Sequence, residues 1–586
     1  MTAGPEQGGS RGLRRTFVAG CAVASIVLSS CGSRGPNPAP SPVATGVPSG
    51  APAGPASGEP GPPPCAAPVP AAVPGPWWEN RVFYEAFVRS FADADGDGFG
   101  DLAGMTARLD YLNDGDPSTT DDLGVTGIWL MPVFASGSYH GYDVTDYGAI
   151  EPDYGTIEDF RAFLAAAHTR GIKVILDLVL NHTSIDHPWF QDALAGGPHR
   201  DWYLWRDADP RWLPVAGGSP WHESASGWYY GAFGARMPDL NLNNPLVTAE
   251  LVRTAEAWLD EGVDGFRLDA VKHLIEKGSE TQVNTTETRV WLRDFRAALH
   301  AAHPDAFVLG EVWESRAITT NYVSEGSLDQ VFDFGIGPAI LGAATLGDAT
   351  SLEVGLSEVS DRYPPGGAAT FLTNHDQPRA MTVLRGDVAA AAQSAAALLT
   401  GPGTPFIYYG EELGMRGTKP DEDIRTPLPW TSSGPGFGFT TGTPWEPFGP
   451  GAESGNVTLE AAVPGSLLST YRDLIRLRGT HPELAGGTVT RLETARADLA
   501  ATLRVIGGRA ALVVQNLGDR PAVEAALTLD SGPLCGEPGA TLAYASDAAI
   551  EHSPAQPSIT ATGGLDAYRP LPLLPARSTV VIDLSP

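Results

Sequence analysis

The sequence predicts an α/β protein: a (β/α)8 TIM barrel with an inserted domain after its third strand, followed by a C-terminal antiparallel β-domain. Apolar strand-like segments alternate with helix-like segments from residue 77 onward, as parallel strands joined by crossover helices do. After about residue 485 the helical pattern stops, and short alternating stretches follow over 499–506 and 509–515. Polar residues end four of the apolar runs, at 177–182, 265–273, 309–312 and 371–376. Because the strand ends of such a barrel share one face, these residues are expected to converge there.

The eight strands and their helices follow one another along the chain. The first strand is predicted over 82–88 and the second over 125–134, because each is an apolar run of suitable length. The third, fourth and fifth strands are predicted to end at His182, Asp269 and Glu311. The sixth, seventh and eighth are predicted over 331–334, 368–373 and 405–409, and helices over 104–112, 157–170 and 466–478.

The spacing of the polar strand ends locates the insertion. A barrel repeat takes roughly 30 residues. The step from Asp177 to Asp269 is 92 residues, which leaves about 60 residues beyond one repeat. This surplus predicts an inserted domain over 183–244, between barrel parts at 77–182 and 245–484. The C-terminal β-domain then takes 485–586.

The N-terminus predicts export. Arg14 and Arg15 precede an apolar run over 17–28 that ends in Leu28-Ser29-Ser30-Cys31, and this run is too short for a membrane-spanning helix. It resembles a bacterial lipoprotein processing box, with residues 1–30 as the signal peptide and Cys31 as the lipidated residue. The arginine pair also resembles a twin-arginine signal. An ordinary signal peptide with an incidental Cys31 is the alternative. The lipoprotein hypothesis places the protein outside the cytoplasm, anchored to the cell membrane through the lipid.

Residues 31–76 are predicted to be a linker, because they are almost wholly Pro, Ala, Gly, Ser and Val and cannot form a core. Of the four cysteines, Cys21 would leave with the signal peptide and Cys31 would carry the lipid. Cys65 and Cys535 remain as an even pair in an oxidising compartment, so a disulfide between them is a hypothesis.

The net charge limits the kinds of partner that the protein can bind. A formal charge of −31 argues against nucleic acid or an anionic lipid surface as the main partner, because both need clustered Lys and Arg. A neutral substrate is compatible with such a surface. An acidic surface kept for solubility explains the charge equally well.

Three of the polar strand ends carry carboxylates in a specific order: Asp269 in Phe-Arg-Leu-Asp, Glu311 after Leu-Gly, and Asp376 in Asn-His-Asp. Together they resemble the α-amylase family of retaining glycoside hydrolases and transglycosidases, over residues 77–586, and within it the intermediate group between oligo-1,6-glucosidases and neopullulanases. The resemblance implies that Asp269 is the nucleophile and Glu311 the general acid/base. It implies that Asp376 binds sugar hydroxyls and favours the distorted transition state.

The chemistry of retention explains these residue types. One carboxylate attacks the anomeric carbon, and a second carboxyl, roughly 5–5.5 Å away, protonates the leaving oxygen. Arg267 lies two residues before Asp269 on the same strand, points to the same side and can hold its charge. Asp177 is expected to orient Arg267 rather than to touch substrate. The substrate-binding residues that complete the expected site are Tyr142, His182, Arg267, Lys272, His273, His375 and Arg425.

The segment after the first strand predicts a structural calcium site. Alternate carboxylates with a glycine between them form an oxygen-rich turn that suits Ca2+, and a solvated acidic turn is the alternative. The segment resembles the EF-hand-like loop of oligosaccharide-cleaving family members, which implies a backbone carbonyl at Phe99 among the ligands. The expected ligands are Asp93, Asp95, Asp97, Phe99 and Asp101. The resemblance to many α-amylases adds Asn181 as a ligand of a second calcium ion.

The markers of specificity disagree. Lys272-His273 after the nucleophile looks like α-amylases that grip the leaving-group side, and Tyr139 stands where exo-acting α-glucosidases have an Asp. Arg425, in contrast, resembles the glucosidases. We interpret the chain as a monomeric, endo-acting α-amylase that cleaves α-1,4 bonds in starch, maltodextrins or related α-glucans. The alternatives are an exo-acting α-glucosidase or oligo-1,6-glucosidase, a transglycosylase such as trehalose synthase, and an inactive glycan-binding surface protein.

Overall fold

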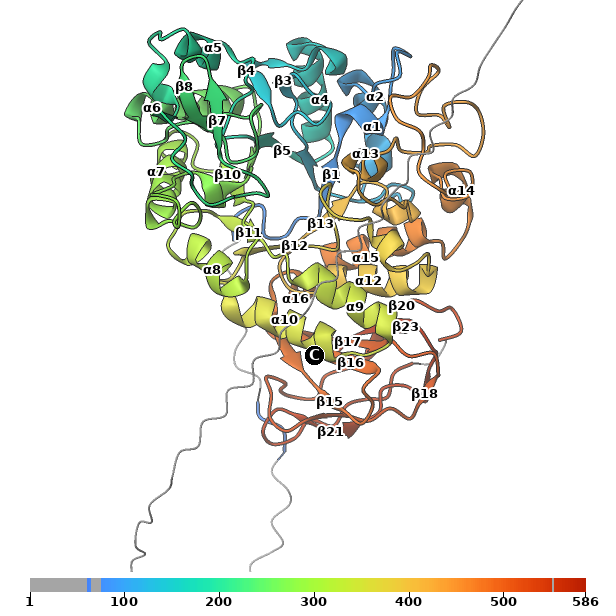
Figure 1. Ribbon diagram of the computed structural model, residues 1–586. Coiled ribbons are helices and arrows are strands. Elements are labelled where there is room, and N and C mark those ends of the chain that lie inside the picture. Colours follow the sequence, from blue (N-terminus) through green and yellow to red (C-terminus); the bar gives the residue numbers. More distant parts are fainter. Residues whose placement is uncertain (1–60, 65–74, 551–552, 586) are drawn as a thin grey trace, which may run out of the picture. The chain divides into compact units, whose positions relative to one another are not determined.

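Eight parallel strands close into a barrel (Figure 1), which confirms the predicted fold class. The computed structural model describes residues 61–64, 75–550 and 553–585. The first strand pairs with both the second and the eighth, so the barrel sheet has no free edge. The strands are β1 (Phe83–Ala86), β2 (Gly127–Leu130), β5 (Lys173–Leu178), β9 (Gly265–Leu268), β10 (Phe307–Gly310), β11 (Gln330–Phe332), β12 (Ala368–Phe371) and β13 (Thr404–Tyr408).

Aromatic rings fill the interior of the barrel. Phe83, Trp129, Phe307, Phe332 and Phe406 belong to one buried cluster, and the rings of Phe83 and Phe406 stack with centroids 4.6 Å apart. The interior of an eight-stranded barrel is just wide enough for side chains to fill it. The barrel interior is therefore a packed core, and a substrate can bind only at the rim where the strands end.

Helices cover the outside of the barrel, each burying one face against it. α4 (Ile157–Thr169) begins at a capping box formed by Thr156 and Asp159. The other helices longer than ten residues are α6 (Pro245–Asp260), α7 (Thr286–Ala302), α9 (Ile336–Leu346), α10 (Thr350–Arg362), α12 (Val388–Thr400) and α15 (Leu467–Thr480). Within the described ranges, no helix has both the length and the apolar character needed to cross a membrane.

The structure differs from the expectation at the first helix and at the strand ends. The helix predicted over 104–112 is two short helices, α2 (Leu102–Ala107) and α3 (Leu109–Leu112). The Asp101 side chain caps α2 by accepting from the Gly104 N–H at 2.6 Å. The third strand ends at Leu178 rather than at His182, because its last ladder partner on β9 is Leu268. The polar residues that follow therefore lie in loops above the strands.

Two additional sheets follow barrel strands. β3 (Phe134–Ser136) and β4 (Val144–Ile150) form an antiparallel pair after β2. After β5 come α5 (Pro188–Leu194) and the strands β6 (Trp205–Arg206), β7 (Trp221–Ser224) and β8 (Gly227–Tyr230), in the order β6-β8-β7. Trp221 and Tyr230 form the buried centre of this second sheet. Because both sheets follow carboxyl ends of barrel strands, they form walls around the polar face.

The C-terminal residues form an antiparallel β-domain, as predicted. Its main sheet has the order β14-β16-β17-β23-β20, and it is formed by β14 (Thr488–Arg491), β16 (Leu499–Ile506), β17 (Arg509–Asn516), β20 (Thr541–Ala545) and β23 (Ser578–Asp583). Gly507 and Gly508 join β16 to β17 with φ of 56° and 86°, and positive φ at both residues is what a tight two-residue hairpin needs. The Gln393 side chain of α12 donates to the Asn516 carbonyl at 2.7 Å and so ties this domain to the barrel.

Several predictions concern residues that the structure does not describe. The signal peptide (1–30), Cys31, Cys65 and most of the linker (31–76) lie outside the described residues. Cys535 is disulfide-bonded, and the Gly536 N–H donates to the Pro63 carbonyl at 3.0 Å. The segment 61–64 therefore lies beside Cys535, and the Cys65–Cys535 pairing stays a prediction.

A buried carboxyl after β13 predicts how stability depends on pH. Burial raises the pKa of Glu411 to about 8, although Tyr471 donates a hydrogen bond to the carboxyl at 2.6 Å. In the unfolded chain the carboxyl keeps its ordinary pKa of 4.5, so the folded state binds more protons between these two values. The free energy of unfolding must therefore fall as the pH rises from about 4.5 to 8.

We expect Glu411→Gln to remove this dependence, because the amide still accepts from Tyr471 and carries no charge to bury. The variant should gain about 4 kcal/mol of unfolding free energy over the parent at pH 8 and less than about 1 kcal/mol at pH 5. Urea denaturation at both pH values measures it, with the exposed Glu453→Gln as the matched control. Parallel pH profiles for parent and Glu411→Gln would contradict the assignment.

Candidate active site

Side chains from segments far apart in the sequence line one cleft at the carboxyl ends of the barrel strands. Its volume is about 420 Å³. It brings together Asp269, Glu311 and Asp376, which the sequence analysis took from three separate motifs. The full lining is His140, Tyr142, His182, Phe233, Met237, Asp269, Ala270, Lys272, His273, Glu311, Trp313, Asp376, Asp421 and Arg425.

One buried guanidinium organises the carboxylates. Arg267 is 1% exposed, and its Nη1 lies 2.8 Å from Asp177 and 2.7 Å from Asp269. Its Nη2 lies 2.7 Å from Glu311. Asp177 is fully buried and accepts two bonds from Arg267, so it holds the guanidinium in place. Arg267 itself does not line the cleft: it lies behind Asp269 and Glu311 and sets their positions.

Asp269 and Glu311 are neighbours because they share this guanidinium. Ala270, directly after Asp269, has φ 47°, a left-handed conformation that is uncommon outside glycine. It donates its N–H to Glu311 at 3.1 Å. Burial raises the pKa of Glu311; Arg267 opposes this shift, while Asp269 and Asp376 add to it. A carboxyl whose pKa is raised can keep its proton near neutral pH and act as a general acid.

Asp376 belongs to a second charged cluster. Burial alone would raise its pKa, but the positive charges of His375 and Arg425 lower it by more than burial raises it. The net pKa therefore lies below its ordinary value. Arg425 Nη2 donates to Asp376 at 3.1 Å. The ring nitrogens of His375 are held by Glu85 at 2.5 Å and by the Tyr142 hydroxyl at 2.7 Å. His375 was expected to donate directly to a sugar. In the structure it is 1% exposed and holds Tyr142 and Asp376 instead.

The contact between His375 and Glu85 gives a direct prediction. Burial lowers the pKa of His375, but Asp376 and Glu85 raise it more, with Arg425 opposing them, so the net pKa lies above its ordinary value. We expect Glu85→Gln to lower the pKa of His375, because it removes one carboxylate and leaves the fold of β1 intact. Histidine-labelled NMR titration measures the pKa, with His375→Gln used to assign the signal. A titration midpoint that does not move would refute the coupling.

Histidines and an aromatic ring also line the cleft. Burial lowers the pKa of His182 and lowers that of His273 to about 4, so both rings are neutral at pH 7. The Phe233 ring, from the sheet inserted after β5, lies 5.4 Å from the His182 ring and 5.0 Å from the His273 ring. Lys272 Nζ donates to the Trp313 carbonyl and to Glu314, each at 3.0 Å. This lysine therefore fixes the segment that follows Glu311.

Several residues of the site were not predicted from the sequence: Glu85, Phe233, Trp313 and Asp421. Glu85 is the next-to-last residue of β1, but the strand predicted over 82–88 placed it in the middle; a single carboxylate within that apolar run was the available signal. Trp313 is 46% exposed although its ring stacks on Phe334 with centroids 4.6 Å apart. Phe233 lies in a loop and Asp421 begins the one-turn helix α13 (Asp421–Ile424), and neither segment is long enough for a periodicity that indicates which way a side chain points.

The predicted calcium loop places carboxylates together. One oxygen each of Asp93, Asp95 and Asp101 lies within 4.8 Å of the other two, a donor set that fits a hard cation. Asp97 is not part of that cluster, and its carboxylate accepts from the Phe99 N–H at 2.8 Å. The Asn181 side chain lies 3.3 Å from His182 Nδ1. Asp239 carries a buried carboxylate oxygen without a partner, and its backbone forms a bridge with His182.

The chain is similar to known proteins in both sequence and structure. Residues 85–487 match the family model of the alpha-amylase catalytic domain. The chain is 38% identical over 450 residues to "Alpha-amylase 3" of Dictyoglomus thermophilum, covering 75% of this chain and 85% of the relative. It is 31% identical over 524 residues to an oligo-1,6-glucosidase of Parageobacillus thermoglucosidasius, covering 76% and 91%. The crystal structure of an alpha-amylase from H. orenii superposes with a TM-score of 0.75 at 39% identity, covering 86% of this chain and 99% of that one.

Proposed function

Because the chain belongs to the α-amylase family of glycoside hydrolases, we propose that it hydrolyses internal α-1,4 bonds of starch, maltodextrins or related α-glucans with retention of configuration. The observation that carries this proposal is the shared Arg267 guanidinium, which keeps two carboxylates side by side on a cleft. Such a pair suits double displacement at one anomeric carbon.

The reaction proceeds in two steps. In the first, an Asp269 oxygen attacks the anomeric carbon while Glu311 gives its proton to the leaving glycosidic oxygen, and the C–O bond to the leaving sugar breaks. Asp269 is then esterified to the glycosyl group. In the second, Glu311 takes a proton from water as the water oxygen attacks the same carbon, and the bond to Asp269 breaks. Arg267 stabilises Asp269 as a carboxylate, and Asp376 binds the sugar hydroxyls.

Endo action is supported by the two ends of the cleft. Trp313 presents an exposed aromatic face on the side of Lys272 and His273, where further sugar units of the leaving group can stack. At the other end, Arg425 is paired with Asp376 and Asp421, and the Tyr139 ring stacks on Trp445 with centroids 5.4 Å apart. The charges there are already paired within the protein, so they leave no free group to select a terminal sugar.

An exo-acting glucosidase is the second candidate, favoured by the similarity to an oligo-1,6-glucosidase. Digestion of a maltoheptaoside blocked at its non-reducing end separates the two. Early mid-chain products support endo action, whereas no cleavage until the block is removed favours the exo candidate. The product spectrum also reports transglycosylation, which would appear as products longer than the substrate.

We also propose that the loop 93–101 holds a structural calcium ion through Asp93, Asp95 and Asp101, with Asp97 and the Phe99 carbonyl as further ligands, and that Asn181 and Asp239 belong to a second site. Bound Ca2+ would neutralise the clustered carboxylates and fix the segment between β1 and α2. Because a ligand that binds only the folded state stabilises it by about 2.7 kcal/mol at 100 times its Kd, chelation should lower the melting temperature by several degrees.

The calcium prediction has a matched variant. Asp95→Ala should melt at the lower temperature of the calcium-free parent, whether EDTA is present or not. Asp116→Ala, in an exposed turn, should respond to EDTA like the parent. Differential scanning calorimetry in 2 mM Ca2+ or EDTA (concentrations of about this order saturate or empty such sites) measures both. Equal melting temperatures of the parent in the two buffers would contradict the calcium site at this loop.

The N-terminal hypotheses remain proposals. We propose that Cys31 carries a lipid that anchors a monomeric enzyme outside the cytoplasm, and that Cys65 pairs with Cys535. Intact-mass measurement tests both, since a lipidated Cys31 adds the acyl mass and a disulfide lowers the mass by two hydrogen atoms until it is reduced.

A further inference from the structure

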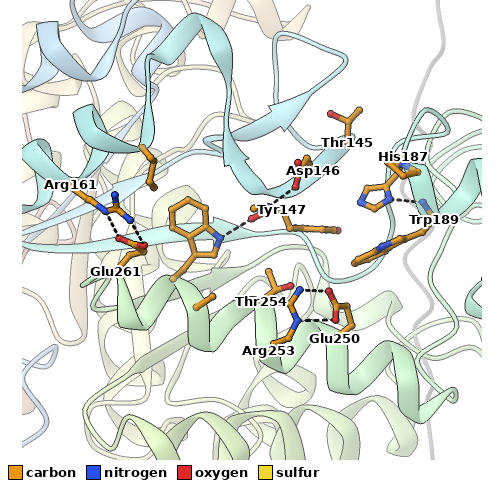
Figure 2. A pocket seen from close by; sticks show the side chains of 15 residues that line it. Thr145, Asp146, Tyr147, Arg161, His187, Trp189, Glu250, Arg253, Thr254 and Glu261 are labelled. Atoms are coloured by element: carbon orange, nitrogen blue, oxygen red, sulfur yellow. Dashed lines mark hydrogen bonds and ion pairs between the residues drawn. The ribbon is translucent and has the colours of Figure 1, made fainter.

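A second pocket lies outside the cleft, between β4, α4, α5 and α6 (Figure 2). Its volume is about 520 Å³, and it shares no lining residue with the active-site cleft. Figure 2 shows the rings of Tyr147 and Trp189 between Thr145 and His187 on one side and the Arg253–Glu250 pair on the other.

The aromatic surface of this pocket is rigid. The Tyr147 and Trp189 rings are stacked, with centroids 5.8 Å apart and planes at 27°. The Trp258 indole donates to the Tyr147 carbonyl at 2.8 Å. The Tyr147 hydroxyl donates to the Val179 carbonyl at 2.7 Å, which ties this wall to the end of the third barrel strand. Trp189 is only partly buried, so part of its ring remains available to a ligand.

Two arginine–glutamate pairs supply most of the charged groups of the pocket. Arg161 binds Glu261 through two hydrogen bonds of 2.7 Å, and Arg253 also donates two hydrogen bonds to Glu250. Burial lowers the pKa of His187 to about 4, so its ring is neutral at pH 7. Two arginines therefore face Glu250, Glu261 and Asp146, which leaves a local charge of only about one negative unit. Such a pocket favours a neutral ligand that offers both an apolar face and hydroxyl groups.

We propose that this pocket binds a segment of the α-glucan substrate, with a glucose ring against the partly exposed Trp189, which the buried Tyr147 ring supports from behind, and hydroxyls on the Arg–carboxylate pairs. The proposal rests on the proposed function for the identity of the glucan. A second contact on the same polymer raises the local concentration of chain near the cleft, so long substrates gain more than short ones.

Ala257 allows the pocket to be blocked without removing a core contact. It is exposed on α6 and lines the pocket, so Ala257→Trp should fill the space. Ala249→Trp is the matched control, because Ala249 is exposed on the same helix and does not line the pocket. Trp189→Ala removes the aromatic platform directly; if that variant folds poorly, Ala257→Trp alone decides.

The test is calorimetric titration of maltoheptaose into Asp269→Asn protein, which binds substrate without cleaving it. We expect Asp269→Asn to bind two equivalents of maltoheptaose. The double variant with Ala257→Trp should bind one equivalent, and the double variant with Ala249→Trp should bind two. Trp189→Ala should weaken the second site at least about tenfold. An unchanged stoichiometry and affinity in Ala257→Trp would overturn the pocket proposal. A single equivalent in Asp269→Asn that Ala257→Trp abolishes would support the pocket while refuting glucan binding by the cleft.

Two further measurements sharpen the assignment. With active enzyme, Ala257→Trp should raise the KM for soluble starch several-fold and leave kcat/KM for maltotriose unchanged. Cellohexaose, a β-linked chain, should not occupy the pocket. Equal binding of cellohexaose would overturn the assignment to an α-glucan.

Discussion

Asp269→Ala is expected to lower kcat on maltodextrins by roughly 10⁴-fold or more, because it removes the only group placed to form the glycosyl-enzyme and leaves binding in the cleft intact. Asp269 is 8% exposed and takes one of the Arg267 contacts, so its loss leaves the Asp177 and Glu311 contacts in place. The melting temperature should therefore change little. Steady-state kinetics with maltoheptaose measures the loss.

Chemical rescue assigns the roles of the two carboxylates separately. Azide added to Asp269→Ala with an α-glucosyl fluoride should attack from the vacated face and give the β-glucosyl azide. In Glu311→Ala, azide should instead resolve the glycosyl-enzyme and give the α-glucosyl azide. If Asp269→Ala gave the α-glucosyl azide and Glu311→Ala the β-glucosyl azide, Glu311 would be the nucleophile. Activity of Asp269→Ala without azide at a tenth of the parent's rate would refute the assignment altogether.

Arg267→Leu is expected to cost about 3–5 kcal/mol of unfolding free energy and most of the activity, because it leaves buried carboxylates without their counterion. Asp177 suffers most, since it is fully buried and holds two of the Arg267 hydrogen bonds. The double variant Arg267→Leu with Asp177→Leu should recover part of the stability and none of the activity. Urea denaturation and kinetics measure these separately.

The control for Arg267 is an arginine of the surface. Arg293 is half-exposed and pairs only with the neighbouring Asp294, so Arg293→Leu should change the unfolding free energy by less than about 0.5 kcal/mol. Arg267→Lys distinguishes charge from shape, because one ammonium group cannot reach three carboxylates at once. If Arg267→Leu were as stable as Arg293→Leu, the guanidinium would not be the organising group.

Most of the barrel could be predicted from the sequence, since each strand is a short apolar run followed by polar residues. The predicted strands were nonetheless too long at several exits. Val179 and Leu180 continue the apolar pattern of β5, but its ladder with β9 stops at Leu178. Hydrophobicity alone does not show where a neighbouring strand stops pairing, because that depends on the register of the barrel.

The sequence by itself determined the fold class, because alternating apolar segments and polar strand ends are local patterns. The resemblance to the α-amylase family then singled out Asp269, Glu311 and Asp376 among the polar residues at those strand ends. Only the tertiary structure decided which groups those carboxylates meet. Glu85 and His375 are 290 residues apart and lie within hydrogen-bond distance, and Arg267 gathers side chains from three strand ends. Such contacts arise from closure of the barrel, which sets distances that no spacing along the chain contains.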